Sequence, residues 1–129
     1  MTTETLIILL TFVLALVHYL LPALFLLPAN GLVVLAGSRD NIVKPQGLVY
    51  ERAGRALVNF KETVPWALGL LILVQVTGDA NAATATGGWL YLLGRVAYLP
   101  LYLTGVPWLR TVAWAASIVG LCMVALQLL

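Results

Sequence analysis

The sequence predicts an all-α integral membrane protein, built as a four-helix bundle. Hydrophobic residues make up 62% of its 129 residues and charged residues only 9%, whereas about a quarter of an ordinary soluble domain is charged. Four apolar runs approach the length of about 20 residues that a membrane-spanning helix needs. These runs lack the alternation of barrel strands, and open sheets cannot cross lipid. We therefore expect a single helical domain over residues 1–129.

The four apolar runs are separated by short polar connectors. The helices are expected, in order, at residues 5–36, 48–76, 88–103 and 107–128. Pro22 and Pro28 should break the first helix, because proline removes a backbone hydrogen bond. The connectors GSRDNIVKPQG, TGDANAATATGG and TGVP are rich in turn-forming residues. No lysine or arginine precedes the first run, so we expect a retained helix there rather than a cleaved signal peptide.

The basic residues gather toward one end of the predicted bundle. Arg39 and Lys44 lie in the first connector, and Arg52 and Arg55 follow just inside the second helix. Because cytoplasmic loops of membrane proteins carry an excess of lysine and arginine, we expect this end in the cytoplasm and both termini outside. The net charge of +2 is too small to indicate nucleic-acid binding.

Polar side chains follow one face of the second helix. Arg52, Arg55, Asn59 and Glu62 are spaced by 3, 4 and 3 residues, which places them in one row that rises about 15 Å. A charge facing hydrocarbon costs about 2.5–3.5 kcal/mol, so the row should face the bundle interior or a subunit interface. Arg52 could instead extend to lipid headgroups, and Glu62 could form a structural ion pair with Arg95 or Arg55. The row as a whole favours a site for a polar, anionic ligand.

A second set of candidate residues lies on the third and fourth helices. Arg95, Tyr98 and Tyr102 share one face, and buried tyrosine hydroxyls can donate to a carboxylate or thiolate. The alternative for both tyrosines is an aromatic belt at the membrane surface. Arg110 could contact headgroups, or lower the pKa of a ligand thiol and so populate the nucleophilic thiolate. His18 and Cys122 are each single, which argues against a metal cluster or an intramolecular disulfide, and we expect His18 to be a hydrogen-bonded packing residue.

The segment ERAGRALVNFKETVP, followed about thirty residues later by RVAYLPLYLTGVPWLR, resembles the MAPEG family, the membrane-associated proteins in eicosanoid and glutathione metabolism. The resemblance covers essentially the whole chain and is strongest to the bacterial branch. It implies a homotrimer in the bacterial inner membrane, with sites at the subunit interfaces that open to the cytoplasm. It also implies glutathione as co-substrate, which members conjugate to lipophilic electrophiles or use to reduce lipid hydroperoxides.

The resemblance further implies roles for individual residues. Arg52, Arg55, Asn59 and Glu62 match the family's glutathione-binding motif on the second helix. Arg95 and Tyr102 match the third-helix positions that complete the pocket, and Tyr98, which is adjacent to them, is also expected to bind glutathione. Arg110 matches the arginine proposed to stabilise the thiolate, and Tyr102 completes the expected catalytic pair. No metal is implied.

Two other classes of membrane protein have the same length and helix number. A non-catalytic member of the same fold would bind a lipid or a partner protein, and would keep Glu62 and Arg95 as a structural pair. A small multidrug exporter would need a carboxylate within its first helix for proton coupling. The only acid there is Glu4, at the extreme end of that helix, so the sequence argues against an exporter.

Overall fold

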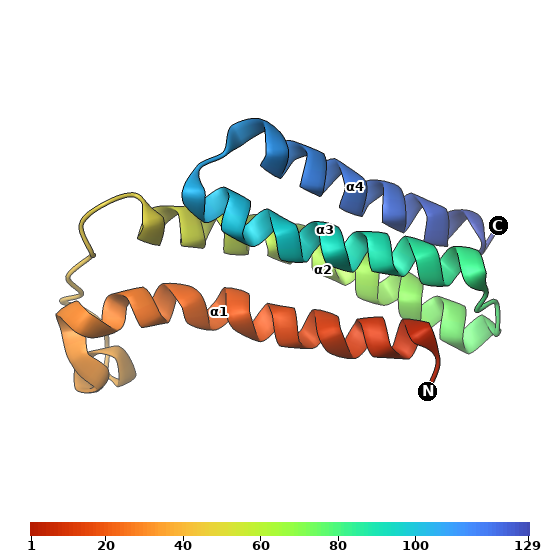
Figure 1. Cartoon of the computed structure of the whole chain (residues 1–129). Coiled ribbons are helices and arrows are strands. Elements are labelled where there is room, and N and C mark those ends of the chain that lie inside the picture. The colour runs from red at the N-terminus through yellow and green to blue at the C-terminus, as the bar shows by residue number, and fades with distance from the viewer.

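The computed structural model describes all residues, 1–129, and contains four helices that lie side by side (Figure 1). The helices are α1 (Thr3–Ala36), α2 (Val49–Thr77), α3 (Ala82–Thr104) and α4 (Pro107–Leu126). Both termini lie at one end of the bundle, and the α1–α2 connector and the α3–α4 turn lie at the other. The predicted all-α architecture is therefore confirmed. By length and composition, α1, α2 and α4 can each cross a membrane.

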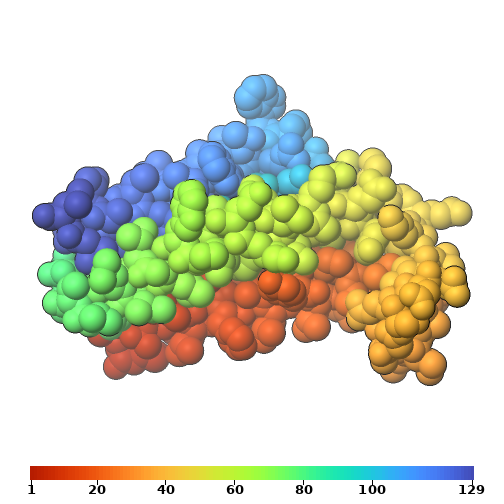
Figure 2. All heavy atoms as spheres, turned by 180° about the vertical axis from the view of Figure 1, so that it is seen from behind, coloured from red at the N-terminus to blue at the C-terminus, as the bar shows by residue number.

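The break expected at Pro22 and Pro28 occurs instead at Gly31. Helix α1 runs through both prolines, and Gly31 leaves the helical conformation with φ of 72°, a left-handed value that glycine adopts without steric cost. Prolines are tolerated in transmembrane helices because neighbouring groups satisfy the freed carbonyls. Next to the break, Asn30 exchanges hydrogen bonds of 2.8 and 2.7 Å with the backbone of Val43. The end of α1 and the connector thus form a lobe at one end of the molecule (Figure 2).

Helix α3 begins at Ala82, six residues before the expected start at 88. The reason is a capping box at Asn81. The Asn81 side chain accepts hydrogen bonds from the backbone N–H groups of Ala83 and Thr84, at 2.8 and 3.1 Å. The Thr84 hydroxyl in turn accepts from the Asn81 N–H at 2.8 Å. Most of the expected connector is therefore helical, while the other helix ends agree with expectation to within two residues.

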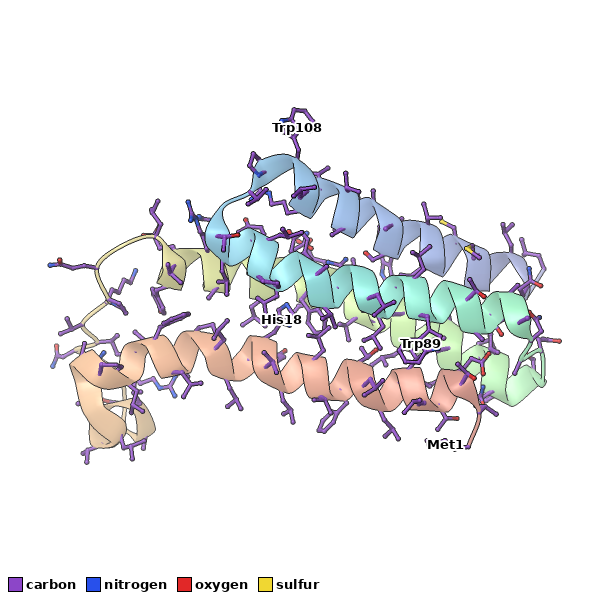
Figure 3. All side chains as sticks on the ribbon, viewed as in Figure 1. Met1, His18, Trp89 and Trp108 are labelled. Atoms are coloured by element: carbon purple, nitrogen blue, oxygen red, sulfur yellow. The ribbon has the colours of Figure 1, made fainter.

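Helices α3 and α4 approach each other closely because glycines line their contact. A Cβ atom on Gly94 would lie 2.7 Å from the carbonyl oxygen of Ala113, and one on Gly87 would lie 2.6 Å from that of Gly120. Small residues of this kind let membrane helices pack backbone to backbone. The contact brings the C-terminal half of α3 beside the start of α4, where Trp108 projects away from the bundle with 82% of its surface exposed (Figure 3).

Candidate functional site

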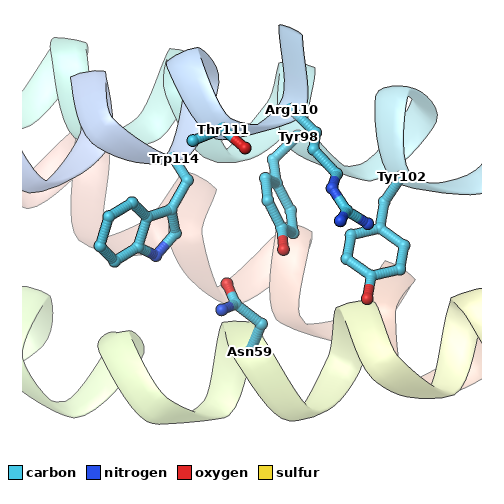
Figure 4. A pocket seen from close by; sticks show the side chains of 6 residues that line it. All are labelled: Asn59, Tyr98, Tyr102, Arg110, Thr111 and Trp114. Atoms are coloured by element: carbon cyan, nitrogen blue, oxygen red, sulfur yellow. The ribbon is translucent and has the colours of Figure 1, made fainter. Parts of the chain in front are cut away.

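A cavity of about 210 Å³ lies where the C-terminal half of α3 and the first turns of α4 face α2. Its walls are formed by Asn59, Tyr98, Tyr102, Arg110, Thr111 and Trp114. Figure 4 shows Asn59 reaching from α2 toward the side chains of α3 and α4. Four residues singled out from the sequence, on three different helices, thus line one cavity. They are Asn59, Tyr98, Tyr102 and Arg110.

Arg110 supplies the cavity with a positive charge that no carboxylate neutralises. Its guanidinium carbon lies 4.6 Å from the centre of the Tyr102 ring, within the range of a cation–π interaction. The Tyr98 ring lies 5.4 Å from the Tyr102 ring and is tilted by 55°. The one ion pair in the chain joins Arg55 and Glu51, so Arg110 has no acidic partner. This wall can therefore offer a cation and phenol hydroxyls to an anion.

Arg95 lies directly behind the cavity and is only 1% exposed. Its Nη1 atom donates a hydrogen bond of 2.8 Å to Oδ1 of Asn59, and its guanidinium carbon lies 5.5 Å from the Tyr98 ring centre. Because Oδ1 of Asn59 accepts from Arg95, the amide nitrogen of Asn59 remains as a donor for the cavity. Arg95 thus adds a second positive charge and fixes the orientation of a cavity residue.

The two arginines at the start of α2 lie outside the cavity. Arg52 donates a hydrogen bond of 3.1 Å from Nη1 to the carbonyl oxygen of Leu103, and so satisfies one of the free carbonyls at the C-terminal end of α3. Arg55 lies 3.7 Å from Glu51, and both side chains are more than half exposed. Within one chain, Arg52 holds the α3–α4 turn and Arg55 points away from the bundle.

Glu62 is exposed and forms no ion pair within the chain. The expected pairing with Arg95 or Arg55 is therefore absent, and Arg95 is bonded to Asn59 instead. The reason is the rotation of α2, whose buried stripe includes Phe60 and Thr63. This rotation turns Asn59 toward α3 and leaves Glu62 on the outside.

Thr111 and Trp114 are cavity residues that the sequence did not single out. Trp114 follows Arg110 by four residues, and side chains at that spacing lie on one helix face, so the spacing offered a signal. The expectation for His18 is confirmed. The ring lies on the inner side of α1 (Figure 3), its Nδ1 is 3.0 Å from the carbonyl oxygen of Leu14, and it stacks on Phe60 at 4.1 Å.

Comparison with known proteins agrees with the fold and with the resemblance in the sequence. The sequence model of the MAPEG family matches residues 5–129, which include nearly all of α1 and the whole of the other three helices. No curated protein and no solved structure matches the chain. With its membrane-spanning helices and this nearly complete match, the chain is an integral membrane protein that belongs to the MAPEG family.

Proposed function

We propose that the protein is a membrane-bound, glutathione-dependent transferase or peroxidase that acts on lipophilic electrophiles or lipid hydroperoxides. The observation that carries this proposal is the arginine–tyrosine wall of the cavity, where Arg110 lies 4.6 Å from the Tyr102 ring without a carboxylate partner. A thiolate is an anion that needs such a cation and such hydroxyl donors. Membership of the MAPEG family is consistent with glutathione chemistry.

The chemistry of the surrounding side chains fits glutathione, which carries two carboxylates, an ammonium group and a thiol. Arg52, which uses Nη1 on Leu103, and Arg55, which pairs with Glu51 within the chain, are the cations that would bind the carboxylates. Glu62 has no ion-pair partner in the chain and would bind the ammonium group. Donors from Asn59 and Tyr98, with the charge of Arg95 behind them, suit the peptide portion. Each polar group of the tripeptide thus has a complementary side chain among the predicted residues.

A single chain provides only part of such a site, which supports assembly as a homotrimer. The cavity of about 210 Å³ is smaller than the roughly 300–1,000 Å³ of ordinary ligand pockets. Arg55 and Glu62 are exposed on a membrane-spanning helix, where a charge facing lipid costs about 2.5–3.5 kcal/mol. A neighbouring subunit packed on this face of α2 would remove that cost and enclose the tripeptide at the interface.

The proposed reaction begins with loss of the thiol proton to solvent. Arg110 stabilises the resulting thiolate, and Tyr102 donates a hydrogen bond to it. With an electrophile, the sulfur forms a bond to carbon while the leaving group departs with the bonding electrons and is then protonated. With a hydroperoxide, the thiolate attacks the terminal oxygen and the O–O bond breaks, which gives a sulfenic acid and an alkoxide that takes a proton from solvent to become the alcohol. The thiol of a second glutathione then attacks the sulfenic sulfur, a disulfide forms, and water leaves. Holding glutathione in one orientation makes this encounter effectively intramolecular.

The distribution of charge supports a site that opens to the cytoplasm of a bacterial cell, with both termini outside the inner membrane. Arg39, Lys44, Arg52 and Arg55 gather at the connector end of the bundle, opposite the termini, and basic residues favour the cytoplasmic side. A cytoplasmic site would have access to glutathione, while the bilayer would deliver the lipophilic substrate.

A thermal-shift titration of the detergent-purified protein with glutathione tests this function, with the ultraviolet absorbance of the thiolate followed in parallel. We expect saturable stabilisation, which amounts to about 2.7 kcal/mol when the ligand is at 100 times its Kd, together with thiolate formation. S-methylglutathione should stabilise the protein without the absorbance change, because it has no thiol. Absence of any shift at millimolar glutathione would favour the alternative, a non-catalytic protein that binds a lipid or a partner.

A further inference from the structure

A second cavity, of about 280 Å³, lies between α1 and α2 and shares no residue with the candidate site. Its walls are formed by Ala15, Tyr19, Phe60, Lys61, Val64 and Pro65. Lys61 is the only charged residue among them, and the Tyr19 hydroxyl is the only other polar side-chain group. One turn of helix takes 3.6 residues, so Lys61 points about 160° away from Asn59 of the candidate site. The cavity therefore lies on the other flank of α2, and it combines one cation with an apolar surface.

Nothing in the chain neutralises the charge of Lys61. The residue is exposed, and the one ion pair of the chain joins Arg55 and Glu51. The ammonium nitrogen of Lys61 lies 5.6 Å from the centre of the Tyr19 ring, within the range of a cation–π interaction. This contact holds the charge at the cavity, although a cation exposed toward hydrocarbon is costly. An anion bound beside Lys61 would remove that cost.

The polar and apolar parts of the cavity lie at different depths. Helices α1 and α2 run in opposite directions (Figure 1), so Ala15 lies farther from the α1–α2 connector than Tyr19. Pro65 likewise lies farther from the connector than Lys61. Both pairs are four residues apart, which is about 6 Å along a helix. The charged end of the cavity thus faces the connector and the apolar end faces the middle of the bundle, which is how the head and the chain of an amphiphile are oriented in the adjacent leaflet.

The apolar wall is fixed from the interior of the protein. Phe60 is 1% exposed and stacks on His18, with 4.1 Å between the ring centres and 10° between the planes. A wall that is already ordered loses little conformational entropy when a chain packs against it. Tyr19 is 53% exposed, and its hydroxyl can donate a hydrogen bond to an anion beside Lys61. The cavity therefore offers two groups to an anionic head and a preformed surface to a chain.

We propose that this cavity binds a single-chain anionic amphiphile, a long-chain fatty acid in its carboxylate form. The carboxylate lies between the Lys61 ammonium group and the Tyr19 hydroxyl. The chain packs along Phe60, Val64 and Pro65, toward the bilayer centre. The cavity is separate from the arginine–tyrosine wall, so this inference does not depend on the proposed glutathione function.

The depth of Lys61 favours a free carboxylate over the phosphate of a bilayer phospholipid. Lys61 lies twelve residues after Val49, the first residue of α2, or roughly 18 Å along the helix. The helix of 29 residues is about 43 Å long, so it extends about 7 Å beyond each side of a hydrocarbon core of about 30 Å when centred in it. Lys61 then lies roughly 11 Å inside the core. A phospholipid phosphate is held at the surface by its two chains and glycerol, whereas a single chain can move deeper.

Palmitate binding tests the site, by a thermal-shift titration of the protein in an uncharged maltoside detergent. We expect saturable stabilisation by palmitate and at least tenfold weaker binding of hexadecanol, which has the same chain length but no charge. Lys61→Gln removes the cation and should weaken palmitate binding at least tenfold. Lys44→Gln is the matched control, because it removes the same charge from the connector, outside the cavity, and it should bind palmitate like the wild type.

A second pair of variants tests the place of the chain. Val64→Trp fills the apolar end of the cavity and leaves Lys61 and Tyr19 unchanged, and it should also weaken palmitate binding at least tenfold. Val76→Trp adds the same bulk to α2 at a position that is 77% exposed and outside the cavity. This control should bind palmitate with the affinity of the wild type.

Four results would overturn the proposal. If the wild type binds hexadecanol as tightly as palmitate, the site does not recognise a carboxylate, and this comparison holds even if a variant does not fold. If Lys61→Gln binds palmitate like the wild type, Lys61 is not part of the site. If phosphatidylglycerol rather than palmitate gives saturable, Lys61-dependent stabilisation, the ligand is a phospholipid. If Lys61→Gln instead breaks an oligomer seen by native mass spectrometry, a second copy of the chain covers the cavity. None of these measurements uses glutathione, so they stand whether or not the proposed function does.

Discussion

The hydrogen bond between Arg95 and Asn59 should be among the strongest polar contacts that stabilise the bundle. Arg95 is 1% exposed, and this bond of 2.8 Å is the one partner found for its guanidinium. Hydrogen bonds to charged groups contribute about 1.5–3 kcal/mol, whereas ordinary bonds between membrane helices average about 0.6 kcal/mol. Arg95 also lies nine residues before the end of α3 at Thr104, roughly 14 Å along the helix, so its charge is far from the headgroups.

A double-mutant cycle isolates this contact. Asn59→Leu removes the acceptor and leaves a buried charge unpaired, while Arg95→Met removes the charge and keeps an unbranched side chain. Each single variant should be destabilised, and the double variant should be less destabilised than the sum of the two. We expect a coupling free energy of about 1.5–3 kcal/mol, measured by reversible unfolding in mixed micelles followed by circular dichroism.

The exposed pair of Arg55 and Glu51 is the control for this cycle. These residues are four apart on one helix, with side chains 54% and 59% exposed, and such pairs contribute only about 0.3–0.5 kcal/mol. Independent sites add to within about 0.3–0.5 kcal/mol. If the coupling free energy of Asn59 and Arg95 is no larger than about 0.5 kcal/mol, their hydrogen bond is not a strong, buried, charge-assisted contact, and the reasoning is refuted.

Three further substitutions test other parts of the fold and site. Gly94→Ala should destabilise the bundle by about 1–3 kcal/mol in the same unfolding assay, because the new Cβ would lie 2.7 Å from the Ala113 carbonyl oxygen. Gly69→Ala is the control and should not destabilise the bundle, because a Cβ there meets nothing within 4 Å. Arg110→Gln should retain glutathione binding in the thermal-shift assay and abolish the thiolate absorbance; unchanged absorbance would remove Arg110 from the mechanism. Asn81→Ala should cost about 0.5–2 kcal/mol through loss of a helix cap, with faster hydrogen exchange confined to the first turn of α3.

Helical spacing was sufficient to predict which polar residues share a helix face, but not which residue they meet on the next helix. The spacing placed Asn59 and Glu62 in one row on α2, yet within the chain Asn59 lines the cavity and bonds Arg95, whereas Glu62 is exposed and forms no ion pair. That choice depends on the rotation of α2 about its axis, which is fixed by how Phe60 packs beneath His18. The rotation of a helix about its axis depends on packing between helices, so it cannot be predicted from the spacing of residues within one helix.

The two errors in the helix limits have different causes. Asn81 followed three residues later by Thr84 is a capping pattern, so the early start of α3 could have been predicted from the sequence. The break at Gly31 could not have been, because Pro22 and Pro28 carry the stronger local signal. Pro22 and Pro28 cannot donate a backbone hydrogen bond whether or not the helix breaks at them. The position of the break is decided instead by the hydrogen bonds that hold Asn30 to the connector at Val43.

Helix α3, which carries Arg95 and Tyr98, is also the most enclosed helix, and this explains why the site lies where it does. Helix α3 has nine buried residues among 23, whereas α1 has seven among 34, and α3 touches all three other helices. It is the one helix that falls short of the hydropathy expected for a membrane span. Ionisable side chains in a membrane face the protein interior or a cavity, so Arg95 and Tyr98 require a helix shielded from lipid. The enclosure of α3 therefore permits the polar face from which the candidate site is built.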